Sequence, residues 1–259
     1  MTSAKQILKI VRFMWKNGVT YGIANNDVIY SVRGNIYDDF EVGQELCHLS
    51  DVKLLAPCEP KTIVGVGGNY YSILKQTGNK AGQEPELFLR PALTAIGPSE
   101  NIIYPKTSHQ VNAGVELAIV IKRRAWEVSE SESFDYVLGY TCGIDLTAFD
   151  LLEADQMRQA RAKSWPTSNP LGPWIVTHLD TSDLGLTARV NGAIVHSGRT
   201  TDLVFGLNSL ISYISRYIVL LPGDVIMTGQ PGTNTLNVGD TIEVEIEKIG
   251  SIRNTVVSV

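Results

Sequence analysis

The stretch from Val111 to Ile121 constrains the fold of this chain more than any other segment. All of its residues are apolar or small except Asn112 and Glu116. In a strand, residues two apart share a face, so Asn112, Gly114 and Glu116 point the same way if the stretch is extended. The apolar run Leu117–Ile121 indicates deep burial. A carboxylate at position 116 therefore needs a partner or a cation, because burying an unpaired charge costs several kcal/mol.

A second isolated carboxylate repeats this pattern. Asp145 follows the small and apolar run Gly139–Ile144 and ends a predicted strand. Two carboxylates at strand ends suggest a site for a hard cation, since Mg²⁺ takes carboxylate oxygens and keeps waters for its remaining positions. The same residues also allow an ion pair with Lys163 or a carboxylate that accepts backbone N–H groups. Spacing alone leaves these alternatives open.

The beginning of the chain predicts a small β module. Residues 5–55 alternate short β-like runs with turn signals such as Asn25–Asp27, a pattern typical of hairpins. Two prolines in segment 54–60 indicate a linker, and the apolar strand Thr62–Val66 follows it. We therefore predict a small N-terminal β domain over residues 1–57 and a main domain over residues 58–259.

Strands dominate the predicted main domain, with a few helices between them. Segment Ser129–Glu132 has the spacing of a capping box ahead of a short helix. A polar helix is expected over residues 150–162, and a 3.6-residue apolar period predicts the longest helix over about residues 202–220. Strict alternation in Thr241–Glu247 marks a half-buried strand. The whole pattern favours a β-rich α+β fold.

Composition and charge exclude several classes of partner. The chain is 44% hydrophobic and 19% charged, which is ordinary for a globular protein. A net charge of -5 without a basic stripe argues against nucleic acid. There is no run of about 18 apolar residues to span a membrane, and the first residues do not resemble a secretory signal. We expect a cytoplasmic protein whose partners include neither nucleic acid nor a membrane.

Nine motifs, taken in order, resemble those of the fumarylacetoacetate hydrolase family. They are Thr62–Tyr70, Leu87–Pro91 with Gly97–Pro98, Val111–Val120, Gly139–Asp145 with Ala148–Asp150, Arg161–Ser164, Pro170–Trp174, Arg189–Gly192, Thr201–Asp202 and Leu221–Gly229. The likeness covers residues 62–257, and the module before them resembles the small N-terminal domain of many members. It implies a mixed β-sandwich roll, usually a homodimer. It also implies a Mg²⁺ or Mn²⁺ site that handles 2-oxo or enol acids.

The resemblance extends to the predicted metal ligands, with one departure. The family signature on this strand is Glu-x-Glu with a later Asp, and the corresponding residues here are Gly114, Val115 and Glu116, with Asp145 intact. Glu116 and Asp145 are therefore the predicted ligands of Mg²⁺ or Mn²⁺. One anionic ligand is missing, so the ion is expected to bind weakly or not at all.

Other site residues follow from the same resemblance. Lys163 matches the family lysine that contacts the oxo-acid oxygens, where an ammonium would stabilise a developing enolate; its alternative is a salt bridge with Asp145 or Glu116. The resemblance also implies substrate contacts for five residues: Asn69, Tyr70, Arg90, Thr228 and Gly229. For Asn69 and Tyr70 a structural role is the alternative, and for Thr228 and Gly229 it is a tight turn.

Two positions depart from the hydrolytic members. Where these commonly carry a His and a Glu as general base, this chain has Ile73 and Gln76, and neither side chain can take a proton at neutral pH. Phe149 also stands where the family often has Arg. We therefore expect an enzyme that isomerises, decarboxylates or cleaves a 2-oxo or 2-hydroxy-dienoic (di)carboxylic acid through an enolate. The alternatives are a degenerate subunit paired with an active paralogue, or a non-catalytic binder of small carboxylates.

Overall fold

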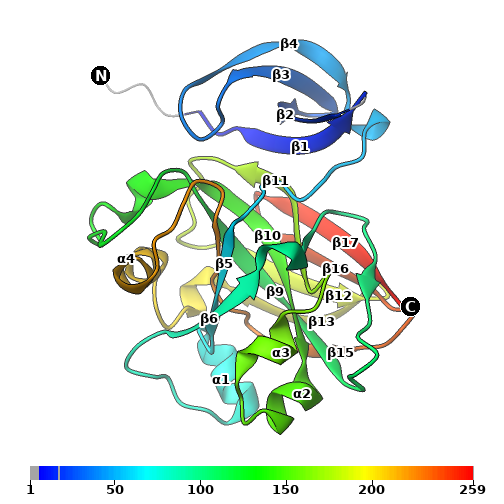
Figure 1. Cartoon of the computed structure of the whole chain (residues 1–259), viewed down its shortest axis with the longest axis vertical. Coiled ribbons are helices and arrows are strands. Elements are labelled where there is room, and N and C mark those ends of the chain that lie inside the picture. Colours follow the sequence, from blue (N-terminus) through cyan, green and yellow to red (C-terminus); the bar gives the residue numbers. More distant parts are fainter. Residues whose placement is uncertain (1–5, 17, 259) are drawn as a thin grey trace.

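Two mixed β-sheets form most of the molecule (Figure 1). The computed structural model describes residues 6–16 and 18–258. Residues 1–5 and 259, at the outer ends of the two predicted domains, and Asn17 lie outside the described residues. The predicted β-rich α+β fold is confirmed.

The first four strands form a separate lobe at the blue end of the chain in Figure 1. They are β1 (Lys9–Trp15), β2 (Gly18–Asn25), β3 (Val28–Gly34) and β4 (Phe40–His48), paired antiparallel in sequence order. The lobe is joined to the rest by hydrogen bonding between β1 and β11 (Asn169–Val176), with Lys9 opposite Val176 and Ile10 opposite Ile175. The predicted boundary at residue 57 stays a prediction, because this pairing makes one sheet of both parts.

The large sheet continues through the main body in the order β4-β3-β2-β1-β11-β10-β9-β14-β5-β6. Its further members are β5 (Thr62–Gly67), β6 (Glu86–Pro91), β9 (Val111–Ile121), β10 (Val137–Ala148) and β14 (Val225–Met227), with β7 (Ala95–Ile96) on β11 and β15 (Asn234–Leu236) on β9. The β5–β14 and β7–β11 pairs are parallel and the others antiparallel, so the sheet is mixed.

The second sheet covers one face of the first. Its order is β13 (Ala193–Arg199), β12 (Gly185–Val190), β16 (Thr241–Ile246), β17 (Gly250–Val257) and β8 (Ile102–Ile103). Leu117 and Ile119 of β9 share one buried cluster with Leu186 of β12 and Val244 of β16. This apolar layer between the sheets is the core of a β-sandwich.

Strand β9 has the predicted bounds, and every one of its residues is buried. It pairs antiparallel with β10 so that Asp145 lies opposite Gly114 and Gly143 lies opposite Glu116. Directly opposed residues of an antiparallel pair point to the same face. The register therefore places the two predicted carboxylates diagonally on one face, while the intervening residues enter the core.

The two helices predicted over residues 150–162 and 202–220 are shorter in the structure, and the helix at Tyr71–Thr77 was not predicted. The helices are α1 (Tyr71–Thr77), α2 (Phe149–Ala154), α3 (Gln159–Lys163) and α4 (Leu207–Tyr217), with 3-10 turns at Leu49–Asp51, Ala92–Thr94, Ser133–Tyr136 and Thr200–Asp202. A continuous helix over 150–162 is wrong, because Gln156 and Met157 have positive φ angles of 55° and 65° between α2 and α3. The helix predicted over 202–220 is only α4, since the N–H of Phe205 is bound to the side chain of Asn69.

The predicted capping box is also wrong. The Ser129 hydroxyl donates to the Glu132 carboxylate at 2.6 Å, and the segment leads into the 3-10 turn at Ser133–Tyr136, whose first turn has no side-chain cap. The two side chains satisfy each other instead of the free backbone N–H groups. Among the helices of the described residues, none has the length and apolar character needed to cross a bilayer.

Candidate functional site

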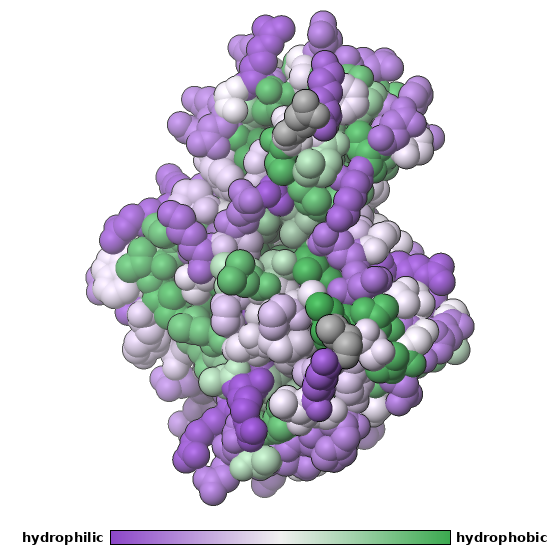
Figure 2. Space-filling model, turned by 45° about the vertical axis from the view of Figure 1, so that its right-hand side comes forward, coloured by the Kyte–Doolittle hydropathy of each residue, from purple (hydrophilic) through white to green (hydrophobic). Residues whose placement is uncertain are grey.

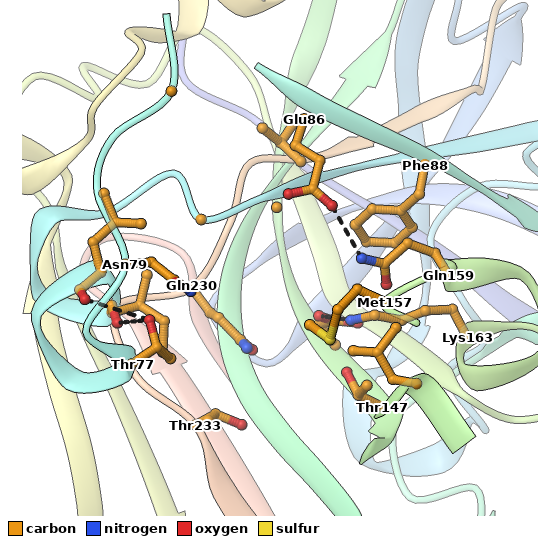
Figure 3. Close-up of a pocket in the computed structure, with 18 of the residues that line it drawn as sticks. Thr77, Asn79, Glu86, Phe88, Thr147, Met157, Gln159, Lys163, Gln230 and Thr233 are labelled. Atoms are coloured by element: carbon orange, nitrogen blue, oxygen red, sulfur yellow. Dashed lines mark hydrogen bonds and ion pairs between the residues drawn. The ribbon is translucent and has the colours of Figure 1, made fainter. Parts of the chain in front are cut away.

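A cavity of about 520 Å³ lies beside β9 and β10, between α1 on one side and α2 with α3 on the other. Its buried polar residues are Asn112, Glu116, Asp145 and Lys163 with Thr147, and we call this set the floor. Its apolar wall consists of Val66, Ile73, Leu74, Phe88, Phe149, Leu152, Met157 and Phe205. In Figure 3, Gln230 extends between the side of α1 and the side that carries Lys163 and Met157. The cavity is large enough for a small organic acid.

Glu116 is held on the floor by the strand pairing and by a backbone donor. Its side chain stands opposite Gly143, where no side chain obstructs it, and its Oε2 accepts a hydrogen bond from the N–H of Gly229 at 2.8 Å. Gly229 has a φ of +96°, which favours glycine at this position. Burial raises the pKa of Glu116 to about 7, while Lys163 and the Gly229 N–H oppose that shift.

Asp145 has a cation on each oxygen. Its Oδ2 accepts a hydrogen bond from Nζ of Lys163 at 2.5 Å, and its Oδ1 is paired with Nη2 of Arg90. The sequence allowed a salt bridge between Lys163 and Asp145 as an alternative, and the structure contains it. Burial lowers the pKa of Lys163, and the Arg90 charge lowers it further. The ammonium still has N–H groups to offer the cavity, because it carries three donors and Asp145 takes one.

Arg90 lies behind the floor and does not line the cavity. Its Nη1 donates to the carbonyl oxygens of Lys163 at 2.8 Å and Ser168 at 3.2 Å, and its Nη2 donates to that of Leu146 at 3.0 Å. The residue is 2% exposed, and burial lowers the pKa of its guanidinium to about 9. Substrate contact by Arg90 stays a prediction that this position does not support. The observed contacts make Arg90 a clamp that fixes Asp145 and Lys163.

Gln230 occupies the space beside Gly114. A Cβ atom on Gly114 would overlap the Gln230 amide and would stand 2.7 Å from the carbonyl oxygen of Gly232. The Oε1 of Gln230 is buried and has no hydrogen-bond partner among the described residues. The space that a longer side chain at position 114 would occupy is therefore not empty. Gln230 and Gly232, in the segment after β14, fill it.

The observed donor set does not fit a divalent ion of the kind that family members commonly use. Both oxygens of Asp145 and one of Glu116 are engaged by N–H donors of the protein. Over residues 6–16 and 18–258, no group of three or more His, Cys, Asp or Glu side chains could hold a metal ion. The fit fails at the position of Gly114, where the third anionic ligand would be.

The two positions of the general base have structural roles. Ile73 is 7% exposed and belongs to the core between the sheets. Gln76 donates from Nε2 to the carbonyl oxygen of Thr233 at 3.4 Å. Helix α1 therefore presents the apolar side chain of Ile73 to the cavity, and Gln76 does not line it, so neither residue offers a group that could activate a water there.

Four predicted substrate-binding residues, Asn69, Tyr70, Thr228 and Gly229, support the site from outside the cavity lining. The Asn69 amide donates to the carbonyl oxygens of Thr228 at 2.8 Å and Phe205 at 3.2 Å. Thr228 donates its hydroxyl to Leu117 O at 2.8 Å. Their contact with substrate stays a prediction.

Several residues that line the cavity were assigned no role in the sequence analysis. Gln230 is the variable position in the Thr-Gly-x-Pro motif that includes Thr228 and Gly229. Its place in this motif is the sequence feature that could have identified it as a site residue. Thr147 stands opposite Asn112 in the β9–β10 pair, so it could have been found from the register of the two strands. Both residues add neutral polar groups to the cavity beside the charged residues of the floor.

Comparisons with known proteins agree with this architecture. The sequence profile described as Fumarylacetoacetate (FAA) hydrolase C-terminal matches residues 62–257, and the profile described as Rv2993c-like, N-terminal matches residues 8–57. An uncharacterized protein of Archaeoglobus fulgidus is 41% identical over 239 residues, which are 89% of this chain and 95% of that protein.

Two relatives have names that state a reaction. Oxaloacetate tautomerase FAHD2A, mitochondrial, of Homo sapiens is 34% identical over 221 residues, which are 80% of this chain and 70% of that protein. The solved structure of 2-hydroxyhepta-2,4-diene-1,7-dioate isomerase from Mycobacterium marinum has a TM-score of 0.90 at 33% identity, covering 97% of this chain and 98% of that one. Both names describe isomerisation.

Proposed function

The chain belongs to the fumarylacetoacetate hydrolase family, and on that premise we propose that it is an isomerase that interconverts the keto and enol forms of a 2-oxo acid. The proposed substrate is a 2-oxo or 2-hydroxy-dienoic (di)carboxylic acid. Relatives named oxaloacetate tautomerase and 2-hydroxyhepta-2,4-diene-1,7-dioate isomerase support this class of reaction.

The observation that carries the proposal is the placement of Lys163. Its ammonium lies on the cavity floor, oriented by Asp145 at 2.5 Å, with N–H groups left for a ligand. An enolate places negative charge on the oxygen at C2, and a fixed cation next to that oxygen stabilises it more than it stabilises the keto form. The floor therefore suits a reaction that passes through an enolate.

Proton transfer needs a second group close to the same carbon. The Glu116 carboxylate is on the floor with one oxygen held by the Gly229 N–H, so it is fixed in orientation. In our proposal Glu116 receives the proton from C3 of the keto form, and the resulting enolate takes that proton back from Glu116 on its C2 oxygen to give the enol; the reverse reaction follows the same steps. The substrate tail then lies along the wall formed by Phe149, Leu152 and Met157.

Decarboxylation or C–C bond cleavage would use the same enolate. Hydrolytic cleavage also needs an activated water, and Ile73 and Gln76 provide no base for one. Isomerisation needs no such water, so we place it first.

A second candidate function is supported by a specific observation. The filling of the Gly114 space by Gln230 and the apolar side chain of Ile73 are also what a catalytically degenerate subunit would show. In that case the chain pairs with an active paralogue that retains Glu-x-Glu. Copurification with such a paralogue, together with no turnover by the isolated chain, would favour this function.

We also propose that the chain forms a homodimer. Figure 2 shows apolar patches between the polar groups of the larger lobe. Leu89 of the edge strand β6 is 54% exposed, Leu93 is 86% exposed and Tyr217 of α4 is 63% exposed. Exposed apolar side chains that gather into a contiguous patch are common where subunits meet. Light scattering after size-exclusion chromatography would test the dimer.

The test of the isomerase is the enol–keto exchange of oxaloacetate, followed by ultraviolet absorbance. We expect catalysed exchange by the wild-type chain and a decrease in kcat of about 100-fold for Lys163→Met, the usual effect of removing one charge-stabilising donor. Lys75→Met is the matched control, because Lys75 is exposed on α1 and its side chain does not line the cavity. Exchange that is equally fast in both variants would refute the proposal.

A further inference from the structure

The oxygens that a divalent ion would need are already used by the chain. Asp145 is paired with Arg90 through one oxygen and with Lys163 through the other at 2.5 Å. Glu116 accepts the Gly229 N–H at 2.8 Å. A divalent ion binds through oxygen atoms of this kind, so these contacts would have to break first.

The buried charges of the floor and of Arg90 also oppose a divalent ion. Glu116 and Asp145 contribute two negative charges when ionised, and Arg90 and Lys163 contribute two positive charges. All four residues are at most 5% exposed. The set is neutral as it stands. A divalent ion added to it would lie next to two buried cations, and excess buried charge is strongly unfavourable.

The space beside Gly114 is also closed to a third ligand of the ion. Position 114 cannot carry even a Cβ without displacing the Gln230 amide, and the carbonyl oxygen of Gly232 would be 2.7 Å away. That carbonyl belongs to the backbone, so it cannot rotate aside as a side chain can. The third ligand position is closed by the chain itself.

We propose that this site binds its anionic ligand without a divalent metal ion. Lys163, held by Asp145 and Arg90, supplies the positive charge, and Gln230 fills the space of the missing ligand. The inference rests on the proposed function only for the chemical class of the ligand, an anion with adjacent oxygens such as a 2-oxo acid. Its test is therefore binding and not turnover.

The first measurement uses the wild-type chain after removal of metals with a chelator. Mn²⁺ is titrated into it by calorimetry, and its thermal unfolding is recorded with Mn²⁺ and with EDTA. We expect no saturable binding and the same Tm in both conditions. Saturable one-site binding, or a Tm several degrees higher with Mn²⁺ as mass action requires for an occupied site, would overturn the proposal.

The second measurement uses oxalate, a planar dianion with adjacent carboxylate oxygens, as the probe. We expect oxalate to bind in the presence of EDTA with an affinity that Mn²⁺ does not change. We expect Lys163→Met to weaken it by about 10-fold or more, the scale of one lost charge-assisted hydrogen bond, and Lys75→Met to leave it unchanged. Oxalate binding only with Mn²⁺, or no binding in either condition, would overturn the proposal.

These arms separate the two proposals. Oxalate binding in EDTA without any enol–keto exchange would refute the isomerase and leave the metal-free site standing. Enol–keto exchange that appears only when Mn²⁺ is added would support the isomerase and refute the metal-free site. The wild-type arms need no variant, so a failure of Lys163→Met to fold does not remove the test.

Discussion

Replacing Arg90 by Met should destabilise the whole main body, and the structure indicates by how much. Arg90 is paired with Asp145 and donates to the carbonyl oxygens of Leu146, Lys163 and Ser168. Breaking a buried ion pair by removing one partner costs about 3–5 kcal/mol. The buried carbonyls that lose their donor add to this. We therefore expect the free energy of unfolding to fall by about 4 kcal/mol or more.

For a chain of this length, each kcal/mol lowers Tm by about 2–4 °C, so Arg90→Met should unfold about 8–16 °C below the wild-type protein. Thermal unfolding followed by circular dichroism measures this, and urea midpoints give an independent value. The matched control is Arg12→Met. Arg12 is also buried and also paired, but its partner Glu59 has a side chain that is 74% exposed.

Removing Arg12 leaves the Glu59 charge in solvent and not buried, and ion pairs in solvent contribute about 0–1 kcal/mol, so Arg12→Met should shift Tm by only a few degrees. If Arg90→Met and Arg12→Met lower Tm equally, then the buried pair is not what holds the cavity floor together, and the clamp that we ascribe to Arg90 does not exist.

Two further predictions concern packing and pH. Gly114→Ala should lower the free energy of unfolding by about 1–3 kcal/mol, because its Cβ meets Gln230 and the Gly232 carbonyl. Gly18→Ala, with nothing within 4 Å of its Cβ, is the control and should have little effect. Equal urea midpoints for Gly114→Ala and Gly18→Ala would contradict the close packing at position 114. His196 has a pKa lowered to about 4 by burial, so the unfolded chain binds its proton first as pH falls below about 6.5, and stability is lost from there down to about pH 4. At pH 5 this loss is about 2 kcal/mol relative to neutral pH, and it should be missing in His196→Gln; the same acid sensitivity in both proteins would show that other groups cause it.

The sequence predicted elements well where one local pattern decided the structure. The buried strand Val111–Ile121 has the predicted bounds, because the apolar run Leu117–Ile121 and the small and apolar residues before it favour an interior position. The helix over 150–162 fails for the opposite reason. Backbone turns at Gln156 and Met157 separate α2 from α3, and no residue of the helical pattern marks them.

Only part of the candidate site could be inferred from the sequence. Glu116, Asp145 and Lys163 are on one floor, as the motifs implied. The clamp by Arg90 and the filling by Gln230 could not be read from the sequence, because each depends on contacts between residues 55 or more positions apart, such as Arg90 with Asp145. Contacts of that kind are set by the strand order of the sheet and not by local spacing.

The pairing of β1 with β11 has a consequence for the cavity, although no described residue of the N-terminal lobe lines it. Without the lobe, the end of β11 at Ile175 and Val176 would lose its partner strand β1, and an unpaired strand edge attracts strands of other chains. Ser168, which accepts from Arg90, directly precedes β11. The lobe therefore covers a strand edge with which other chains could pair, and β11 connects this pairing to the Arg90 clamp at its other end. Local opening of the lobe should reach the cavity floor before the sandwich core opens, and amide hydrogen exchange along β11 would record that order.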